Sequence, residues 1–322
     1  MSSPHAAEVP VKKLAFQRVR RAHTRAFQKQ QKQKTRVRPL AAMKQLQFVQ
    51  LCRRYMTDAL DNVATITHMA NAHTTIFMVG EKHSVHTKCK SILQMFQQLF
   101  RENETHSNPV PIDFMIELLS ESVDFYSQYR PIDSRTNKDQ MNEVRSVFAY
   151  CIEDRNCPFL RVHWTDPTKQ SEKNAIPDWL NYLGDPWDNI RNYWQYDKRF
   201  EHFNEAEDVD RILLENKMIM KEIKKAGEKN PVFTYDFALK QFLRMDRPQY
   251  SGRKRMFFLV RSSMDVYSAA RIVNMNMKHV IYYAGYNHTD NLEKILSALD
   301  FKLLEKKVNR SPCAPNDPSY PD

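Results

Sequence analysis

Short apolar runs and longer amphipathic stretches alternate along this chain. The short runs are rich in β-branched and aromatic residues and predict strands at residues 75–79, 112–117, 159–164 and 279–284. Helical spacing of apolar residues between these runs predicts helices at residues 88–100, 138–151 and over much of 179–276. Because strands that alternate with helices need crossover connections, we expect an α/β fold with a small, mostly parallel sheet flanked by helices.

The segment before the first strand also has a helical pattern. Apolar residues recur there at spacings of three and four, among them Met43, Leu46, Val49, Val63, Ile66 and Met69. This spacing is typical of the buried face of an amphipathic helix. We therefore expect one or two helices across residues 41–72, leading into the first strand.

Composition divides the chain into parts. Residues 1–40 are rich in Arg, Lys and Gln, and we expect a basic, flexible arm. Residues 41–309 are long enough to bury the core of a single α/β domain. Inside it, residues 177–250 combine aromatic and charged helical sequence, which indicates a helical insertion, either a subdomain with its own core or a lid over a substrate. The proline-rich residues 310–322 are expected to be a disordered tail.

The positive charge of the chain is concentrated near its N-terminus. The formal net charge is +11, and residues 9–57 contain 14 Lys or Arg and no Asp or Glu. Such a segment is either a solvated arm, an arm that binds nucleic acid or another polyanion, or a targeting peptide. In the second case the phosphate contacts would come from Arg18, Arg20, Arg21, Arg25, Lys32, Lys34, Arg36 and Arg38.

Cysteine usage and hydropathy point to a location inside the cell. The chain has five cysteines, and none form a C-x-x-C pair, which argues against a disulfide framework and for a reducing compartment. No apolar run approaches the ~20 residues of a membrane span. The N-terminus lacks the apolar core of a secretory signal. We therefore expect an intracellular protein without a membrane span.

Two stretches of the chain share a G-x-x-H pattern at the end of an apolar run. Gly80 is followed by His83, and Gly285 is followed by His288, although the chain contains only 5 glycines. A strand that turns sharply and brings its backbone close to a ligand needs a residue without Cβ. We therefore expect Gly80 and Gly285 to form two backbone turns at the same edge of the sheet.

A histidine or a carboxylate lies in or just after each predicted strand. The residues are Glu81 and His83, then Glu117, then His163 and Asp166, and finally His288, with the amide of Asn291 close behind it. Ligands of open parallel sheets bind at the carboxyl ends of the strands, so we expect these side chains to converge. Imidazole and carboxylate together suit a divalent ion such as Zn, Mn, Fe or Co, which would supply a bound hydroxide. Without a metal, a histidine oriented by a carboxylate can act as a general base on water.

The same residues carry a resemblance to a known family. GEKH after the first strand, IDFMIE, RVHWTD, and DVYSAARIV followed by HVIYYAGYNHTDNL resemble the erythromycin esterase/ChaN-like superfamily, which includes the TIKI and TraB proteins. The chain is most similar to members encoded by nucleocytoplasmic large DNA viruses. The resemblance covers about residues 74–300 and does not include the basic arm.

The resemblance implies an α/β fold and a hydrolase of ester or peptide substrates. By the match, Glu81, His83 and His288 would be the catalytic residues or the ligands of a divalent metal. Glu117, His163, Asp166, Asn291 and Arg271 would be supporting groups. Haem binding, known in one branch of the family, finds no axial-ligand context here beyond the same histidines. The alternative is a virion-associated structural or nucleic-acid-binding protein whose α/β domain is catalytically silent.

Overall fold

A computed structural model describes residues 42–57, 59–82, 92–119, 140–148, 151, 157–167, 213–214, 216–245 and 252–309. The chain forms two compact units, Met1–Val49 and Gln50–Asp322. Residues 42–57 are helical, and the remaining described elements all belong to the second unit. Within the described ranges, no helix is long and apolar enough to span a membrane.

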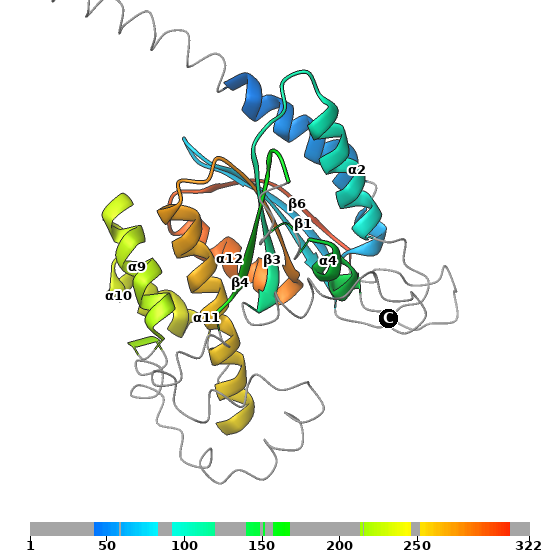
Figure 1. Cartoon of the computed structure of the whole chain (residues 1–322). Coiled ribbons are helices and arrows are strands. Elements are labelled where there is room, and N and C mark those ends of the chain that lie inside the picture. Colours follow the sequence, from blue (N-terminus) through cyan, green and yellow to red (C-terminus); the bar gives the residue numbers. More distant parts are fainter. Residues whose placement is uncertain are drawn as a thin grey trace, which may run out of the picture. The chain divides into compact units, whose positions relative to one another are not determined.

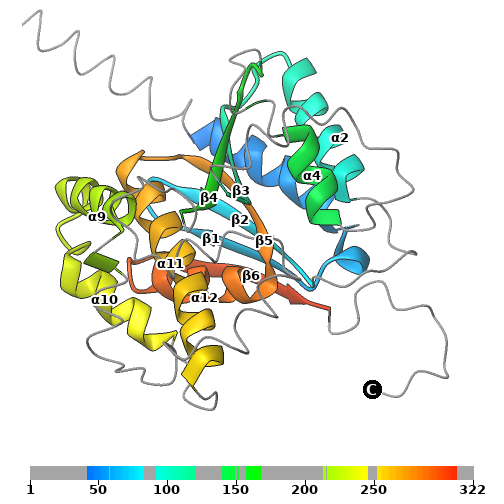
Figure 2. The same ribbon diagram turned by 60° about the horizontal axis from the view of Figure 1, so that its bottom comes forward.

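The second unit is built on a six-stranded sheet. The strands are β1 (Thr65–Ala70), β2 (Thr75–Glu81), β3 (Ile112–Leu119), β4 (Leu160–Asp166), β5 (His279–Gly285) and β6 (Lys302–Val308). Their order is β4-β3-β5-β2-β1-β6, with β4 at one edge and β6 at the other (Figure 2). β4, β3, β5 and β2 are parallel, whereas β1 is antiparallel to both β2 and β6. The predicted α/β fold with a mostly parallel sheet is confirmed.

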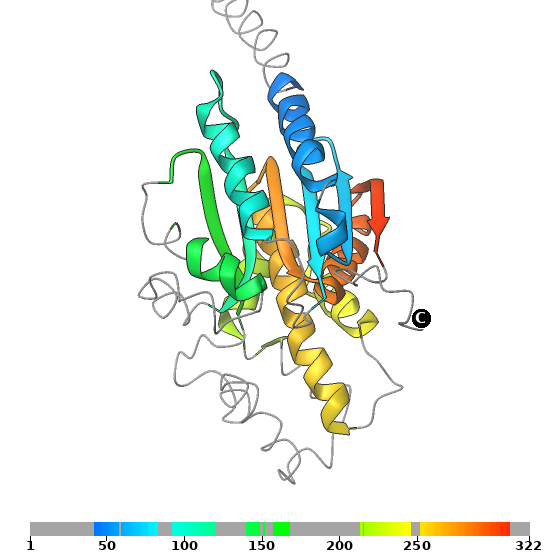
Figure 3. The same ribbon diagram turned by 90° about the vertical axis from the view of Figure 1, so that its right-hand side faces the viewer.

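Helices cover both faces of this sheet. They are α2 (Ile92–Thr105), α4 (Gln140–Phe148), α9 (Lys217–Lys229), α10 (Tyr235–Arg244), α11 (Gly252–Asn274) and α12 (Tyr286–Ser297), with a short 3₁₀ turn η1 at Leu60–Asn62. Figure 1 shows α2 and α4 on one side of the sheet and α11 and α12 on the other. Figure 3, seen from the side of α2 and α4, shows these two helices in front of the strands. The predicted helices at 88–100 and 138–151 are thereby confirmed as α2 and α4.

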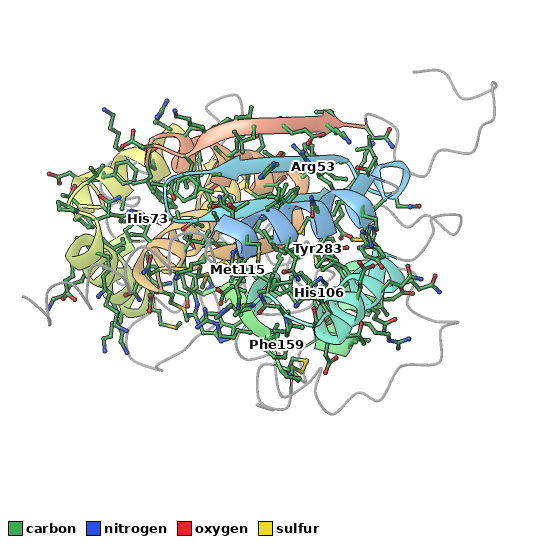
Figure 4. All side chains as sticks on the ribbon, turned by 90° about the horizontal axis from the view of Figure 1, so that it is seen from above. Arg53, His73, His106, Met115, Phe159 and Tyr283 are labelled. Carbon is green, nitrogen blue, oxygen red and sulfur yellow. A yellow bond between two sulfur atoms is a disulfide. The ribbon has the colours of Figure 1, made fainter. Side chains whose placement is uncertain are left out.

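Alternation along the strands divides the core between the two faces. On the α2 face, Phe96 packs against Phe114 of β3 and Tyr283 of β5, with ring centroids 4.8 and 5.2 Å apart. Met115 follows Phe114 in β3, and Tyr282 precedes Tyr283 in β5. Both point to the α11 face, where they join one buried cluster with residues of α9 to α12. Figure 4 labels Met115 and Tyr283, which come from neighbouring strands. Because successive strand side chains point to opposite faces, a polar residue's position in its strand decides which helices it meets.

The helical prediction for residues 41–72 is correct for its first half and wrong for the second. Residues 42–57 are helical, but Thr65–Ala70 form strand β1. β1 lies between β2 and β6, and five of its six residues are buried. Burial on both faces removes the period-two signal of a half-exposed strand, so the apolar positions of TITHMA fit helical spacing equally well. β6, with its exposed Leu303 and Leu304, was not predicted either.

The cysteine spacing argued against a disulfide framework, and the described residues contain one disulfide. Cys151 and Cys157 are joined by a disulfide between the end of α4 and the start of β4. The sulfur–sulfur bond is yellow beside Phe159 in Figure 4. The two cysteines have a sequence separation of 6, so they do not match the C-x-x-C pattern. Cys52, a free cysteine, is buried.

Candidate functional site

Neighbouring parallel strands end in polar residues at one edge of the sheet. Glu81, the last residue of β2, is paired in register with Gly285, the last residue of β5. Glu117 lies near the end of β3, and Asp166 is the last residue of β4. The four strand ends therefore meet at the same carboxyl edge, as the sequence predicted.

His288 is bound to a buried carboxylate from another helix. It lies in the first turn of α12, directly after β5, and its Nδ1 is 2.7 Å from Oδ1 of Asp265 on α11. His288 and Asp265 are both buried, and Asp265 is fully inaccessible. An Nδ1–H that donates to a carboxylate fixes the tautomer in which Nε2 is the basic nitrogen. A histidine oriented in this way by a carboxylate has the chemistry that a general base needs.

Two further polar groups support Asp265. The amide of Asn291, one turn along α12 from His288, donates to Oδ2 of Asp265 at 2.9 Å. Burial raises the pKa of Asp265, while His288 and Asn291 lower it and the charge of Glu117 raises it. Asn291 thus acts through Asp265, and it keeps the carboxylate pointed at the imidazole.

Glu117 fixes the turn that carries His288. Its Oε2 accepts a hydrogen bond of 2.8 Å from the backbone N–H of Gly285, the N-cap residue of α12. Its Oε1 lies 3.8 Å from Arg145 of α4. A carboxylate at the N-terminus of a helix is favoured by the helix dipole and satisfies a backbone N–H. Glu117 is therefore a support of the β5–α12 junction.

Glu81 lies on the other side of the sheet from His288. Its Oε2 accepts a hydrogen bond of 2.5 Å from the hydroxyl of Tyr283, whose ring packs on α2. The preceding residue, Gly80, faces α12. Because adjacent strand residues point to opposite faces, Glu81 points to the α2 face while His288 belongs to the helices of the α11 face.

The two glycines have different structural roles from the predicted turns. Gly80 lies inside β2, where an added Cβ would be 2.5 Å from Thr289 Oγ1 and 2.9 Å from the Cα of Tyr286. Its purpose is to let the first turn of α12 pack directly on the strand. Gly285 is the N-cap of α12 with φ −54° and ψ 146°. Neither Gly80 nor Gly285 has a positive φ. The two glycines of the G-x-x-H pattern therefore serve close packing and helix initiation.

His163 and Arg271 form a separate polar network. Nε2 of His163 is 2.9 Å from Oδ1 of Asp113 on β3, and Oδ2 of Asp113 accepts from Arg161 at 2.8 Å. On its other side, Nδ1 of His163 is 3.4 Å from a terminal nitrogen of Arg271. His163 and Arg271 were predicted to support His288. In the part of the chain that the structure describes, neither residue contacts His288 directly.

Sequence reasoning placed Asp265 in a resembling segment without giving it a role. One sequence signal pointed to it. It is the only acidic residue in a stretch of mainly apolar and small residues, MDVYSAARIV, and acidic residues are rarely fully buried without a partner. Tyr267 and Arg271, one helical turn apart on α11, share a 2.6 Å hydrogen bond. Asp113, which orients His163, carried no signal beyond its place at the start of a strand.

Several predicted residues lie outside the described ranges. They are His83, the lysines and arginines of residues 1–40, residues 177–212 of the predicted insertion, and residues 310–322. Of the predicted metal ligands, only Glu81 and His288 are described, and they point to different faces of the sheet. Among the residues that the structure describes, no three His, Cys, Asp or Glu side chains are grouped to hold a metal ion. Because His83 lies outside the described ranges, the metal site of Glu81, His83 and His288 stays a prediction.

The chain was compared with protein-family models, with curated proteins and with solved structures. It matches none of them.

Proposed function

We propose that the chain is a hydrolase of ester or peptide substrates in which His288 activates water. The single observation that supports this proposal most is the hydrogen bond between His288 and the buried Asp265. A histidine held by a carboxylate has a fixed tautomer and orientation, and the carboxylate stabilises the imidazolium that forms during the reaction. The pair lies at the carboxyl edge of a parallel sheet, where such folds bind ligands.

The reaction follows from this geometry in two proton transfers. Nε2 of His288 takes a proton from water as the water oxygen bonds to the carbonyl carbon of the substrate. The imidazolium, paired with Asp265, then gives the proton to the leaving alcohol or amine as the bond to the carbonyl carbon breaks. Asn291 and Glu117 act as positioning residues, one through Asp265 and the other through the backbone of Gly285. No step of this mechanism uses a metal ion.

Hydrolysis of a substrate panel by the full-length chain tests the proposal. The panel contains p-nitrophenyl esters and fluorogenic peptides, with kcat and KM measured separately. We expect His288→Asn to lower kcat by about 10²–10⁴-fold, the usual contribution of a general base. His73→Asn is the matched control, because His73 is exposed in the turn between β1 and β2. A His288→Asn variant as active as the wild type would refute the role of His288 as the general base.

The charge distribution favours a second function for the N-terminal segment. Residues 9–57 carry 14 basic and no acidic side chains. We propose that this segment binds nucleic acid, which would place the chain in the cytoplasm, the nucleus or a virion. Lys and Arg that neutralise phosphates release counterions, so log K should fall linearly with log salt. Equal DNA affinity of the full chain and of a chain lacking residues 1–40 would contradict this function.

A further inference from the structure

Arg271 is held by two aromatic rings between α11 and β4, which lie side by side in Figures 1 and 2. The rings of Trp164 on β4 and Tyr267 on α11 are stacked, with centroids 5.4 Å apart and an interplanar angle of 6°. The guanidinium carbon lies 5.3 Å from the Trp164 centroid and 5.8 Å from the Tyr267 centroid. One terminal nitrogen donates to the Tyr267 hydroxyl at 2.6 Å. This packing fixes the orientation of the guanidinium plane.

The groups that contact Arg271 are neutral. Burial raises the pKa of Tyr267 to about 12, so its hydroxyl keeps its proton at neutral pH. Burial also lowers the pKa of His163, whose Nε2–H donates to Asp113 and whose Nδ1 faces Arg271. The charge of Asp113 is balanced by Arg161 at 2.8 Å. Within the described ranges, no carboxylate forms an ion pair with Arg271. Besides Arg271, the charge that acts on Tyr267 is that of Glu222 of α9, which lies 3.9 Å from Lys225.

The guanidinium also has unused hydrogen-bonding capacity. Of its five N–H groups, one donates to Tyr267 and one points at His163. The Nε–H is buried and has no hydrogen-bond partner among the described residues. The arginine and Trp164 are both partly exposed, so the site has a solvent side. A partly buried, unpaired charge is costly unless a ligand of opposite charge compensates it.

We propose that Arg271, oriented by Trp164 and Tyr267, is a binding site for an oxyanion, either a carboxylate or a phosphate group. The planar fork of the guanidinium matches two oxygens of such a group, and charge-assisted hydrogen bonds of this kind are the strong ones in proteins. The aromatic stack fixes the fork before the ligand arrives, which reduces the entropy lost on binding. This site is separate from His288, and it does not depend on the proposed hydrolysis.

Titration of the full chain with inorganic phosphate and, separately, with acetate tests the site and distinguishes its two classes of ligand. Binding is followed by calorimetry and by tryptophan fluorescence, with Trp164→Phe identifying the responding residue among the 4 tryptophans. We expect saturable binding of at least one anion, and at least about tenfold weaker binding by Arg271→Gln. Arg54→Gln removes the same charge from an arginine paired with Glu102, and it should bind like the wild type.

Two results would overturn the proposal. The first is the absence of saturable binding of either anion by the wild-type chain up to about 10 mM, an affinity below that of a single strong charged contact. The second is equal binding by the wild type and Arg271→Gln. If the glutamine variant does not fold, Arg271→Lys decides, since it keeps the charge and loses the fork. Anion binding that this lysine variant leaves unchanged would refute a guanidinium site.

Discussion

Asp265 of α11 and His288 of α12 share a 2.7 Å hydrogen bond, although strand β5 separates them in sequence. Asp265 is fully buried, and Asn291 occupies its second oxygen. A buried carboxylate is costly, so its presence beside a histidine at the carboxyl edge of a parallel sheet is typical of a functional pair. The relationship gives His288 a defined orientation, which a G-x-x-H pattern alone cannot do.

Asp265→Asn should abolish hydrolysis without destabilising the fold. Asn cannot stabilise an imidazolium, so kcat should fall by about 10²–10⁴-fold. Burial raises the pKa of Asp265 above its ordinary value of 3.8, which means that the charged form costs more free energy in the folded state than in the unfolded chain. Its ionisation therefore reduces stability as pH rises from 3.8 through the raised folded pKa. Thermal unfolding should give Asp265→Asn a Tm at pH 7 equal to or above that of the wild type.

The pH series provides the control for this variant. As pH falls toward 3.8, the wild-type carboxyl becomes protonated, and the Tm difference between the two proteins should shrink. A large loss of Tm in Asp265→Asn at pH 7, together with a proportional loss of activity, would make Asp265 a structural residue.

Gly80→Ala should destabilise the fold at the contact between β2 and α12. The new Cβ would lie 2.9 Å from the Cα of Tyr286 and 2.5 Å from Thr289 Oγ1, and it would also meet Thr65 Oγ1. Side chains can rotate away, but the Tyr286 backbone must shift, and overpacking of this kind costs about 1–3 kcal/mol. Urea unfolding measures the loss.

A double variant separates the backbone contact from the side-chain contacts. Adding Thr289→Ala to Gly80→Ala removes one clash and should restore only part of the lost free energy of unfolding, because the contact with Tyr286 remains. Unchanged stability of the single variant would show that α12 moves freely on β2.

His68→Phe should stabilise the protein and reduce its sensitivity to acid. His68 is buried, it is stacked on Phe77 with centroids 4.2 Å apart, and its two ring nitrogens have no hydrogen-bond partner among the described residues. Burial, with a further contribution from Arg53, lowers its pKa below 6.5, whereas Glu305 raises it. Below pH 6.5 the unfolded chain therefore takes up a proton before the folded one, and stability is lost as pH falls.

Equilibrium unfolding between pH 7.5 and 5 checks this effect. Removing two buried, unbonded nitrogens should raise the free energy of unfolding by about 1 kcal/mol at pH 7. The slope of this free energy against pH should become smaller, by an amount equivalent to the uptake of at most one proton on unfolding. His163 keeps its own contribution, because its pKa is also lowered. His73→Phe, at an exposed histidine, should keep the wild-type slope. A wild-type slope in His68→Phe would contradict the assignment.

Chelation tests whether a metal takes part. Glu81 is bound to Tyr283 on the α2 face, and His288 is bound to Asp265 on the other, so the described donors do not converge. We therefore expect EDTA dialysis to leave hydrolysis unchanged, with elemental analysis confirming removal of metal. Activity that is lost on chelation and restored by Zn²⁺ or Mn²⁺ would support a site formed by Glu81, His83 and His288. The Glu81→Ala/His83→Ala double variant should then contain less metal than the wild type.

The local sequence pattern was sufficient to predict those strands and helices whose own residues show a clear period or a clear boundary. The runs that became β2, β3, β4 and β5 are short, apolar and bounded by polar or proline residues, so their strands and shared carboxyl edge were predictable. Helical spacing of apolar residues was sufficient to predict α2 and α4. It failed at β1, where burial on both faces erased the alternation that distinguishes a strand from a helix.

The sequence by itself determined the α/β class, the strands of the parallel sheet and the position of His288 just beyond one of them. Only the tertiary structure decided its partner. Side-chain direction in a strand alternates with each residue, so Glu81 turned to the α2 face while α11 brought Asp265 to the imidazole from the other. Such a pairing depends on how α11 packs against α12, which is a long-range property that no local pattern contains.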